Sequence, residues 1–296
     1  MTHFAQDTAI RETWAEQAVW SQAANRLKVA VERARIIALV LGIAAAALGT
    51  AASQTMDGHP GLGRGLAALA AVAAASAPVL AQRGGPARLS DWTRLRAVSE
   101  AFKAEAYTYL AGVGAYRGGG DPAAVLRERC HRFRTGSADL AAHTTGIPPE
   151  NRPLPPVTDG PSYVEHRLLP QLNGYYRPRA ELMRRRVRIV ERVEFLIGGV
   201  GAALAAVAGV YGVEALAAWV AVVASVAVAV AAHATAQRYA YQQLEFTRTA
   251  QELAYLLDKW ESAVDPEPEF TDAFVAECES VISVQNEAWM IRWTLS

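Results

Sequence analysis

The longest apolar stretch of the chain covers residues 195–232, and Glu214 is its only charged residue. As one helix this stretch would be about 57 Å long, whereas the hydrocarbon core of a bilayer is ~30 Å thick. The pattern therefore predicts two membrane spans, 195–213 and 215–232, joined by a very short turn that places Glu214 among the lipid headgroups. The alternative is a helical hairpin buried in a large soluble core. It is disfavoured because core helices seldom stay uncharged over two such lengths.

The first half of the chain repeats this design. Residues 36–53 are uncharged, a glycine-rich loop follows, and a shorter apolar run occupies residues 66–82. Pro78 should kink the shorter run near its end. Its position directly after a good span favours a second hairpin.

Basic residues flank the four apolar runs unevenly. Seventeen arginines and lysines lie on the sides away from the two short loops, whereas the loops themselves hold only Arg64. Basic residues concentrate on the cytoplasmic side of membrane proteins. We therefore expect a multi-pass protein of a bacterial cytoplasmic membrane, with both termini and the central region in the cytoplasm.

A short motif recurs after each hairpin. An aromatic-rich helical pattern contains Arg-x-x-x-Glu, as Arg96 and Glu100 in the first half and as Arg248 and Glu252 in the second. Side chains four residues apart lie on one side of a helix and can form an ion pair. One such pair alone would be an ordinary surface feature, but its recurrence indicates two units in the same orientation.

A proline-rich segment divides the chain. Residues 145–161 contain six prolines and are predicted to be an extended linker. The expected domains are therefore a first two-transmembrane repeat over 1–144 and a second over 162–296.

Outside the membrane the pattern is helical throughout, so the expected fold class is an all-α membrane protein. Asp121 is a helix cap before Pro122 and predicts a helix to about His143. Residues 162–194 and 233–262 should extend the third and fourth spans into the cytoplasm. A last helix, packed on these extensions, should place on one face Phe274, Cys278, Val281, Ile282 and Trp289.

Composition excludes several classes of function. The formal net charge is zero, which argues against a nucleic-acid partner. Two cysteines fit a reducing compartment and argue against a disulfide framework. The six histidines show no metal-ligand spacing, and neighbouring residues such as Cys130 and His131 point about 100° apart on a helix. We expect no enzymatic activity, cofactor or metal.

Two sets of residues in the spans are candidates for function. Small residues at four-residue spacing allow helices to approach closely, either as ordinary packing or in gating; they are Gly201, Ala205 and Gly209. Polar residues near the cytoplasmic ends of the second and fourth spans are candidates for a pore mouth; they are Gln82, His233 and Thr235. His233 has the alternative of reaching the headgroups or capping a neighbouring helix.

The repeated unit consists of a basic helix, a tight two-span hairpin, an aromatic Arg-x-x-x-Glu helix and a terminal amphipathic helix. It resembles the SLATT family, the SMODS and SLOG associating two-transmembrane effector domains of bacteria, here as two tandem copies. The residues that carry this resemblance are Arg33 and Arg35, Trp92 with Arg96 and Glu100, Arg248 with Glu252, and the closing ECESVISVQNEAW.

The resemblance implies a membrane pore of a bacterial conflict or defence system, triggered by a separate sensor protein or a nucleotide signal. Four spans leave little room for a conduit, so we expect a homo-oligomer in the lipid bilayer, gated through its cytoplasmic helices. The alternative is a non-conducting scaffold that presents a helical platform to a partner protein.

Overall fold

The computed structural model describes residues 2–118, 120–150 and 152–294, with side chains for 8–118, 120–150, 152–236 and 238–283. The described residues contain helices and no strand. The helical elements in chain order are α1 (Thr2–Thr55), α2 (Pro60–Arg83), α3 (Pro86–Leu110), η1 (Gly114–Tyr116), α4 (Pro122–Gly136), η2 (Ala138–Leu140), α5 (Ala141–Thr144), α6 (Gly160–Tyr163), η3 (Val164–Leu168), η4 (Pro170–Tyr176), α7 (Arg177–Tyr211), α8 (Glu214–Gln237), α9 (Tyr239–Glu261) and α10 (Pro268–Thr294).

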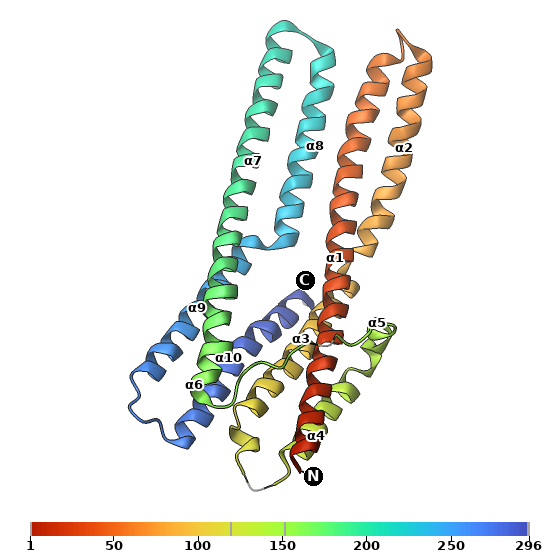
Figure 1. Cartoon of the computed structure of the whole chain (residues 1–296). Coiled ribbons are helices and arrows are strands. Elements are labelled where there is room, and N and C mark those ends of the chain that lie inside the picture. Colours follow the sequence, from red (N-terminus) through yellow and green to blue (C-terminus); the bar gives the residue numbers. More distant parts are fainter. Residues whose placement is uncertain (1, 119, 151, 295–296) are drawn as a thin grey trace. The chain divides into compact units, whose positions relative to one another are not determined.

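Four helical runs among the described residues are long and apolar enough to cross a membrane. They contain the four predicted spans, and they pair as the hairpins α1–α2 and α7–α8 (Figure 1). The chain is therefore an all-α membrane protein with two two-span hairpins, as predicted. Helix α7 ends at Tyr211 rather than at residue 213, because Gly212 adopts a φ of +64° that favours glycine.

Glu214, the single charge of the long apolar stretch, begins α8. A carboxylate in the first turn of a helix is favoured by the positive end of the helix dipole. The residue therefore marks a helix start, which explains why the apolar stretch contains one charge.

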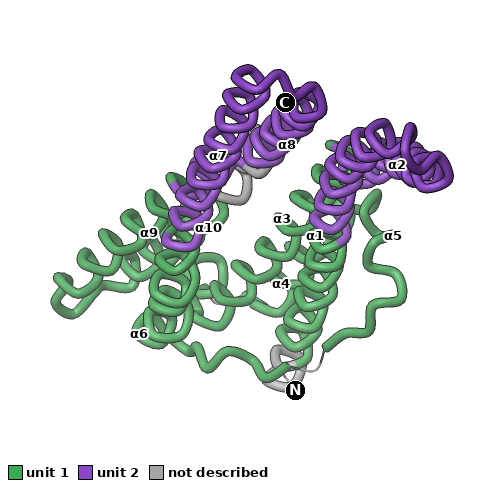
Figure 2. The backbone as a smooth tube through the Cα atoms, turned by 90° about the horizontal axis from the view of Figure 1, so that it is seen from above, with its two compact units in different colours: residues 1–29, 86–180, 244–296 green, residues 30–85, 181–243 purple. Residues whose placement is uncertain are grey.

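The chain forms two compact units, coloured separately in Figure 2. Unit 1 consists of Met1–Val29, Pro86–Ala180 and Leu244–Ser296, and unit 2 of Ala30–Gly85 and Glu181–Gln243. Both halves of the sequence contribute to each unit. The predicted domain boundaries at 144 and 162 remain predictions about the repeat.

Unit 2 contains the two hairpins, which are linked at the α1–α2 turn. The Gln54 amide nitrogen donates to the Ala215 carbonyl at 2.7 Å, and its amide oxygen accepts from Trp219 Nε1 at 3.0 Å. At the other end of the first hairpin, Arg35 Nε donates to the Gly84 carbonyl at 2.8 Å. A Cβ on Gly84 would lie 2.6 Å from Arg35 Cγ, so this close approach requires glycine.

The core of unit 1 is built around α3 and α10, which pack on each other. Phe102 of α3 and Phe274, Cys278 and Ile282 of α10 are buried, so α10 packs on the helix that follows the second span. Trp289, predicted on the same face, lies outside the described side chains.

The proline-rich segment is packed against α1. Residues 145–150 and 152–159 contain no helix, and Trp14 Nε1 donates to the Pro153 carbonyl at 3.0 Å. The guanidinium of Arg152 lies 4.6 Å from the centre of the Trp14 ring. The segment thus runs along α1 up to the start of α6 at Gly160, and its role as a linker between two repeats remains a prediction.

One predicted helix is shorter than expected. The Asp121 carboxylate caps α4 by accepting from Ala123 N at 3.0 Å, as predicted. The helix ends at Gly136 rather than near His143, because Ser137 leaves helical geometry with φ −128° and ψ 22°. The short elements η2 and α5 follow.

Candidate functional site

A stripe of charged and aromatic residues lies along one side of α3. Arg96, Glu100, Lys103 and Tyr107 are separated by four, three and four residues, a spacing that keeps them on one helix face. Arg96 Nη2 lies 2.6 Å from Glu100 Oε1. Burial alone would raise the pKa of Glu100, but Arg96, helped by Lys103 and Arg167, outweighs it and the pKa is lowered. Glu100 is therefore an anion held inside unit 1.

The second part of the site comes from a helical segment with irregular hydrogen bonding. Asp159 and Ser162 form a capping box that begins α6. The following residues form the π-helical elements η3 and η4, on either side of Leu169. Pro170 lacks an N–H, which removes one hydrogen bond of a regular α-helix here. π-helical turns are rare and frequently occur at functional sites.

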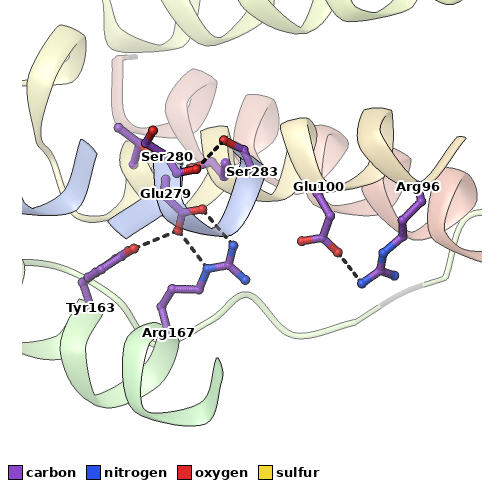
Figure 3. A network of polar contacts seen from close by, with 9 residues as sticks. Arg96, Glu100, Tyr163, Arg167, Glu279, Ser280 and Ser283 are labelled. Carbon is purple, nitrogen blue, oxygen red and sulfur yellow. Dashed lines mark hydrogen bonds and ion pairs between the residues drawn. The ribbon is translucent and has the colours of Figure 1, made fainter. Parts of the chain in front are cut away.

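Arg167 of η3 is paired with Glu279 of α10 (Figure 3). Its Nε and Nη2 donate to the two oxygens of Glu279, each at 2.8 Å. The Tyr163 hydroxyl donates to the same carboxylate at 2.9 Å. The Arg167 side chain has no exposed surface, so α6–η3 and α10 are joined by a desolvated ion pair. Pairs of this kind leave a costly buried charge when one partner is removed.

The electrostatic surroundings of this pair keep its members in fixed protonation states. Burial by itself lowers the pKa of Arg167, but Glu279 outweighs it and the pKa is raised, so the guanidinium stays charged. Burial, with the Glu279 carboxylate, raises the pKa of Tyr163 well above its usual value. The Tyr163 hydroxyl therefore remains a hydrogen-bond donor across the physiological pH range.

Arg167 also contacts the stripe on α3. Its guanidinium carbon lies 4.7 Å from the centre of the Tyr107 ring, within the range of a cation–π interaction. Its third terminal nitrogen, Nη1, is buried and has no hydrogen-bond partner. In Figure 3 the guanidinium lies between Glu279 and the side of α3 that carries Glu100. The two halves of the chain therefore meet in unit 1 at one polar cluster: Arg96, Glu100, Lys103, Tyr107, Tyr163, Arg167 and Glu279, hereafter the polar cluster.

Lys103 is the least satisfied member of the polar cluster. Burial lowers its pKa to about 8, an effect that Glu100 opposes and that Arg167 and Arg96 reinforce. Among the described residues, no side chain makes an ion pair or hydrogen bond with its Nζ. The ammonium group is thus held near two carboxylates without direct contact to either.

The second Arg-x-x-x-Glu motif differs from the first. Arg248 and Glu252 of α9 are both exposed, and the described part of the chain shows no ion pair between them. The two motifs are therefore not equivalent in this structure, and a structural role for Arg248 and Glu252 remains a prediction. In water the attraction between exposed charges at this spacing is worth only a few tenths of a kcal/mol, which is offset by the entropy of the free side chains.

The three candidate pore-mouth residues all lie in unit 2 but are not brought together. Gln82 and Thr235 are exposed, and His233 is half-buried. Within the described chain no hydrogen bond or ion pair joins them. Their assignment to a pore mouth remains a prediction about the assembled protein.

The small residues of the third span do not share one environment. A Cβ on Gly201 would lie 3.3 Å from Val223 Cγ1 of α8, so Gly201 packs inside its hairpin. Ala205 is exposed, and a Cβ on Gly209 would meet no atom within 4 Å. Gly209 therefore has space for contact with another copy of the chain, whereas the space next to Gly201 is filled by Val223 of the same hairpin.

Sequence reasoning did not single out Lys103, Tyr163, Arg167 or Glu279. Glu279 lay in the closing motif that carried the family resemblance, and Lys103 is one of three lysines in the chain. Arg167 lies ten residues before the arginine-rich run 177–192, and no local pattern indicates that it is buried. The only local signal was Pro170 within an otherwise helical pattern, which predicts irregular backbone at this place.

Neither cysteine is suited to nucleophilic chemistry. Both are buried, and burial raises the pKa of the Cys130 and Cys278 thiols. The described residues also contain no group of histidine, cysteine and carboxylate side chains that could hold a metal ion. The polar cluster, with its charged and hydroxyl groups, is suited to binding and to coupling of helices.

Comparison with known families separates the two halves of the chain. Residues 163–289 match the family described as SMODS and SLOG-associating 2TM effector domain 1. Residues 18–123 match a different family, described as a protein of unknown function, DUF4231. No curated protein matches the chain. No solved structure matches it either.

Each of these two matches contains one hairpin and the helix that follows it. The expected tandem pair of SLATT domains is therefore supported for the second copy, whereas the first copy matches another family. The chain is a multi-pass membrane protein whose second half is similar to SMODS and SLOG-associating two-transmembrane effector domains and whose first half is similar to the DUF4231 family.

Proposed function

We propose that this protein is a bacterial membrane effector that assembles into a homo-oligomeric, ion-permeable pore gated through the helices of unit 1. The family match of the second half supports the effector role, because its description names an effector domain with two transmembrane helices. Both termini and the central region lie in the cytoplasm in this proposal, as the distribution of basic residues predicts.

One observation carries the proposal of an assembly. In the apolar windows of the four candidate spans, at most 11% of the residues are buried within the chain, and in the third span none is. Phe195 and Val210 of α7 and Val228 of α8 expose between 70% and 81% of their surface. The described spans of a single chain therefore bury few side chains against each other, which supports a conduit with walls from several copies.

A continuous helical backbone connects unit 1 to the third span. The helical segment Gly160–Tyr211 runs from α6 through η3 and η4 into α7, so the residues of the polar cluster and the third span belong to one continuous helical run. A change in the pairing of Arg167 would act on this run directly. We propose that this is how unit 1 controls the pore.

Ion flux from liposomes tests the proposal. Purified protein should release a trapped ion faster than protein-free liposomes do, and Thr235→Cys protein should lose flux on treatment with a charged thiol reagent. The parent chain is the matched control, because its two cysteines are buried and should not react. Oriented, assembled protein without flux under any ionic or nucleotide condition would favour the scaffold. If the reagent leaves the flux unchanged, the pore is still supported but Thr235 does not lie at its mouth.

A further inference from the structure

The polar cluster contains more positive than negative charge. Arg96, Lys103 and Arg167 are its cations, and Glu100 and Glu279 are its carboxylates. These same residues are the charged groups that act on Lys103. A buried or partly buried cluster of this kind normally balances its charges, because an unpaired ion in a protein interior costs several kcal/mol. Among its described members, the polar cluster therefore carries one more positive than negative charge.

The excess charge coincides with two unused donor groups. Lys103 Nζ makes no ion pair or hydrogen bond among the described residues, and Arg167 Nη1 is buried without a partner. More than nine in ten buried polar groups in proteins have a hydrogen-bond partner, so each exception needs an explanation. Two such atoms occur among the described side chains, Arg167 Nη1 in the polar cluster and Arg152 Nε outside it. Lys103 is partly exposed, so its ammonium group is the accessible donor of the cluster and Arg167 Nη1 the buried one.

The carboxylates of the cluster are already engaged elsewhere. Glu100 lies three residues before Lys103 and four after Arg96, and it is held by Arg96 at 2.6 Å. Both oxygens of Glu279 accept from Arg167, and one of them also accepts from Tyr163. Among the described side chains there is therefore no acceptor for Arg167 Nη1, and Lys103 Nζ, which belongs to a partly exposed side chain, is open to a ligand.

We propose that the polar cluster binds a small phosphate-bearing anion, with Lys103 and Arg167 as its principal donors. A phosphate group carries up to two negative charges and several acceptor oxygens, which matches an ammonium group and a free guanidinium nitrogen. Lys103 and Arg96 are partly exposed, so the anion approaches from their side of α3. Arg167 Nη1 lies beneath the surface, so binding moves the side chains that cover it.

A regulatory role for the anion rests on the proposed function, because it assumes that unit 1 controls a pore. The anion would bridge α3, which follows the first hairpin, and η3, which continues into α7. It would thus contact the helical extensions of both hairpins at once. Binding itself does not depend on conduction and can be measured separately.

The test measures the melting temperature of the full-length protein in neutral detergent at pH 7. Inorganic phosphate is added in increasing amounts at constant ionic strength, and chloride serves as the reference anion. A ligand that binds the folded state raises its melting temperature in proportion to the logarithm of its concentration above Kd. Loss of one charge-assisted contact should weaken phosphate binding in Lys103→Met by about tenfold to a hundredfold. Lys103→Arg should restore it.

Lys259→Met is the matched control, because Lys259 belongs to unit 1 and pairs with Glu277 at an exposed position. This variant should bind phosphate like the parent. No phosphate-dependent stabilisation of the parent, or equal stabilisation of the parent and Lys103→Met, would overturn the proposal. If phosphate binds but liposomes show no ion flux, the anion site is supported and the pore is contradicted. If liposomes show flux but phosphate does not bind, the pore is supported and the anion site is contradicted.

Discussion

Removing the carboxylate of Glu279 should destabilise unit 1 strongly. Glu279→Ala deletes the acceptor of three hydrogen bonds, two from Arg167 and one from Tyr163. Arg167 is 1% exposed and cannot recover these bonds with water. Because Nη1 is already unpaired, the variant would leave none of the three guanidinium nitrogens with a hydrogen-bond partner among the described residues.

The expected loss follows from the behaviour of buried ion pairs. Removing one partner of such a pair costs about 3–5 kcal/mol in the free energy of unfolding. For a unit of this size, each kcal/mol lowers the melting temperature by about 2–4 °C, so the expected decrease is about 6–20 °C. Arg167→Met combined with Glu279→Leu should recover most of this loss, since well-packed apolar side chains can replace a buried pair.

Tryptophan fluorescence during heating provides the assay. Six of the seven tryptophans lie in the residue ranges of unit 1, so the signal reports mainly on this unit. Glu277→Ala is the control two residues away, since the Glu277 side chain is 43% exposed and pairs only at the surface. Its melting temperature should stay within the error of the measurement. A decrease for Glu279→Ala no larger than for Glu277→Ala would refute the role of the buried pair.

Three other predictions concern pH, topology and assembly. The pKa of Lys103 is lowered from 10.5 to about 8, so between these pH values the unfolded chain binds more protons than the folded chain. The contribution of Lys103 to stability should therefore increase with pH over this range. Melting temperatures measured from pH 7 to 10.5 should show this increase in the parent protein and not in Lys103→Met. Reporter fusions at Gly58 and Glu214 should be extracytoplasmic, and a cytoplasmic result at Gly58 would contradict the first hairpin. Gly209→Leu should shift the oligomer distribution on a native gel more than Ala221→Leu does, and equal distributions would remove Gly209 from the interface.

The sequence alone determined the elements of this protein whose causes are local. Spans need about 20 apolar residues in a row, a property of the one-dimensional pattern, so both hairpins were predictable. The Asp121 cap and the interruption of helix in the proline-rich segment were predictable for the same reason, because capping and the loss of N–H groups act within a few residues. The end of α4 at Gly136 was missed, although glycine followed by serine is a pair of residues that favours the end of a helix.

The tertiary structure decided which polar residues matter. The two Arg-x-x-x-Glu motifs differ in their surroundings. Arg96 and Glu100 form an ion pair in unit 1 that is influenced by Arg167 of η3, whereas Arg248 and Glu252 are exposed. Arg167 is buried because a distant α10 supplies Glu279, 112 residues later in the chain. The energy of an ion pair depends on its desolvation, and desolvation is set by the long-range packing of helices rather than by the spacing of charges along any one of them.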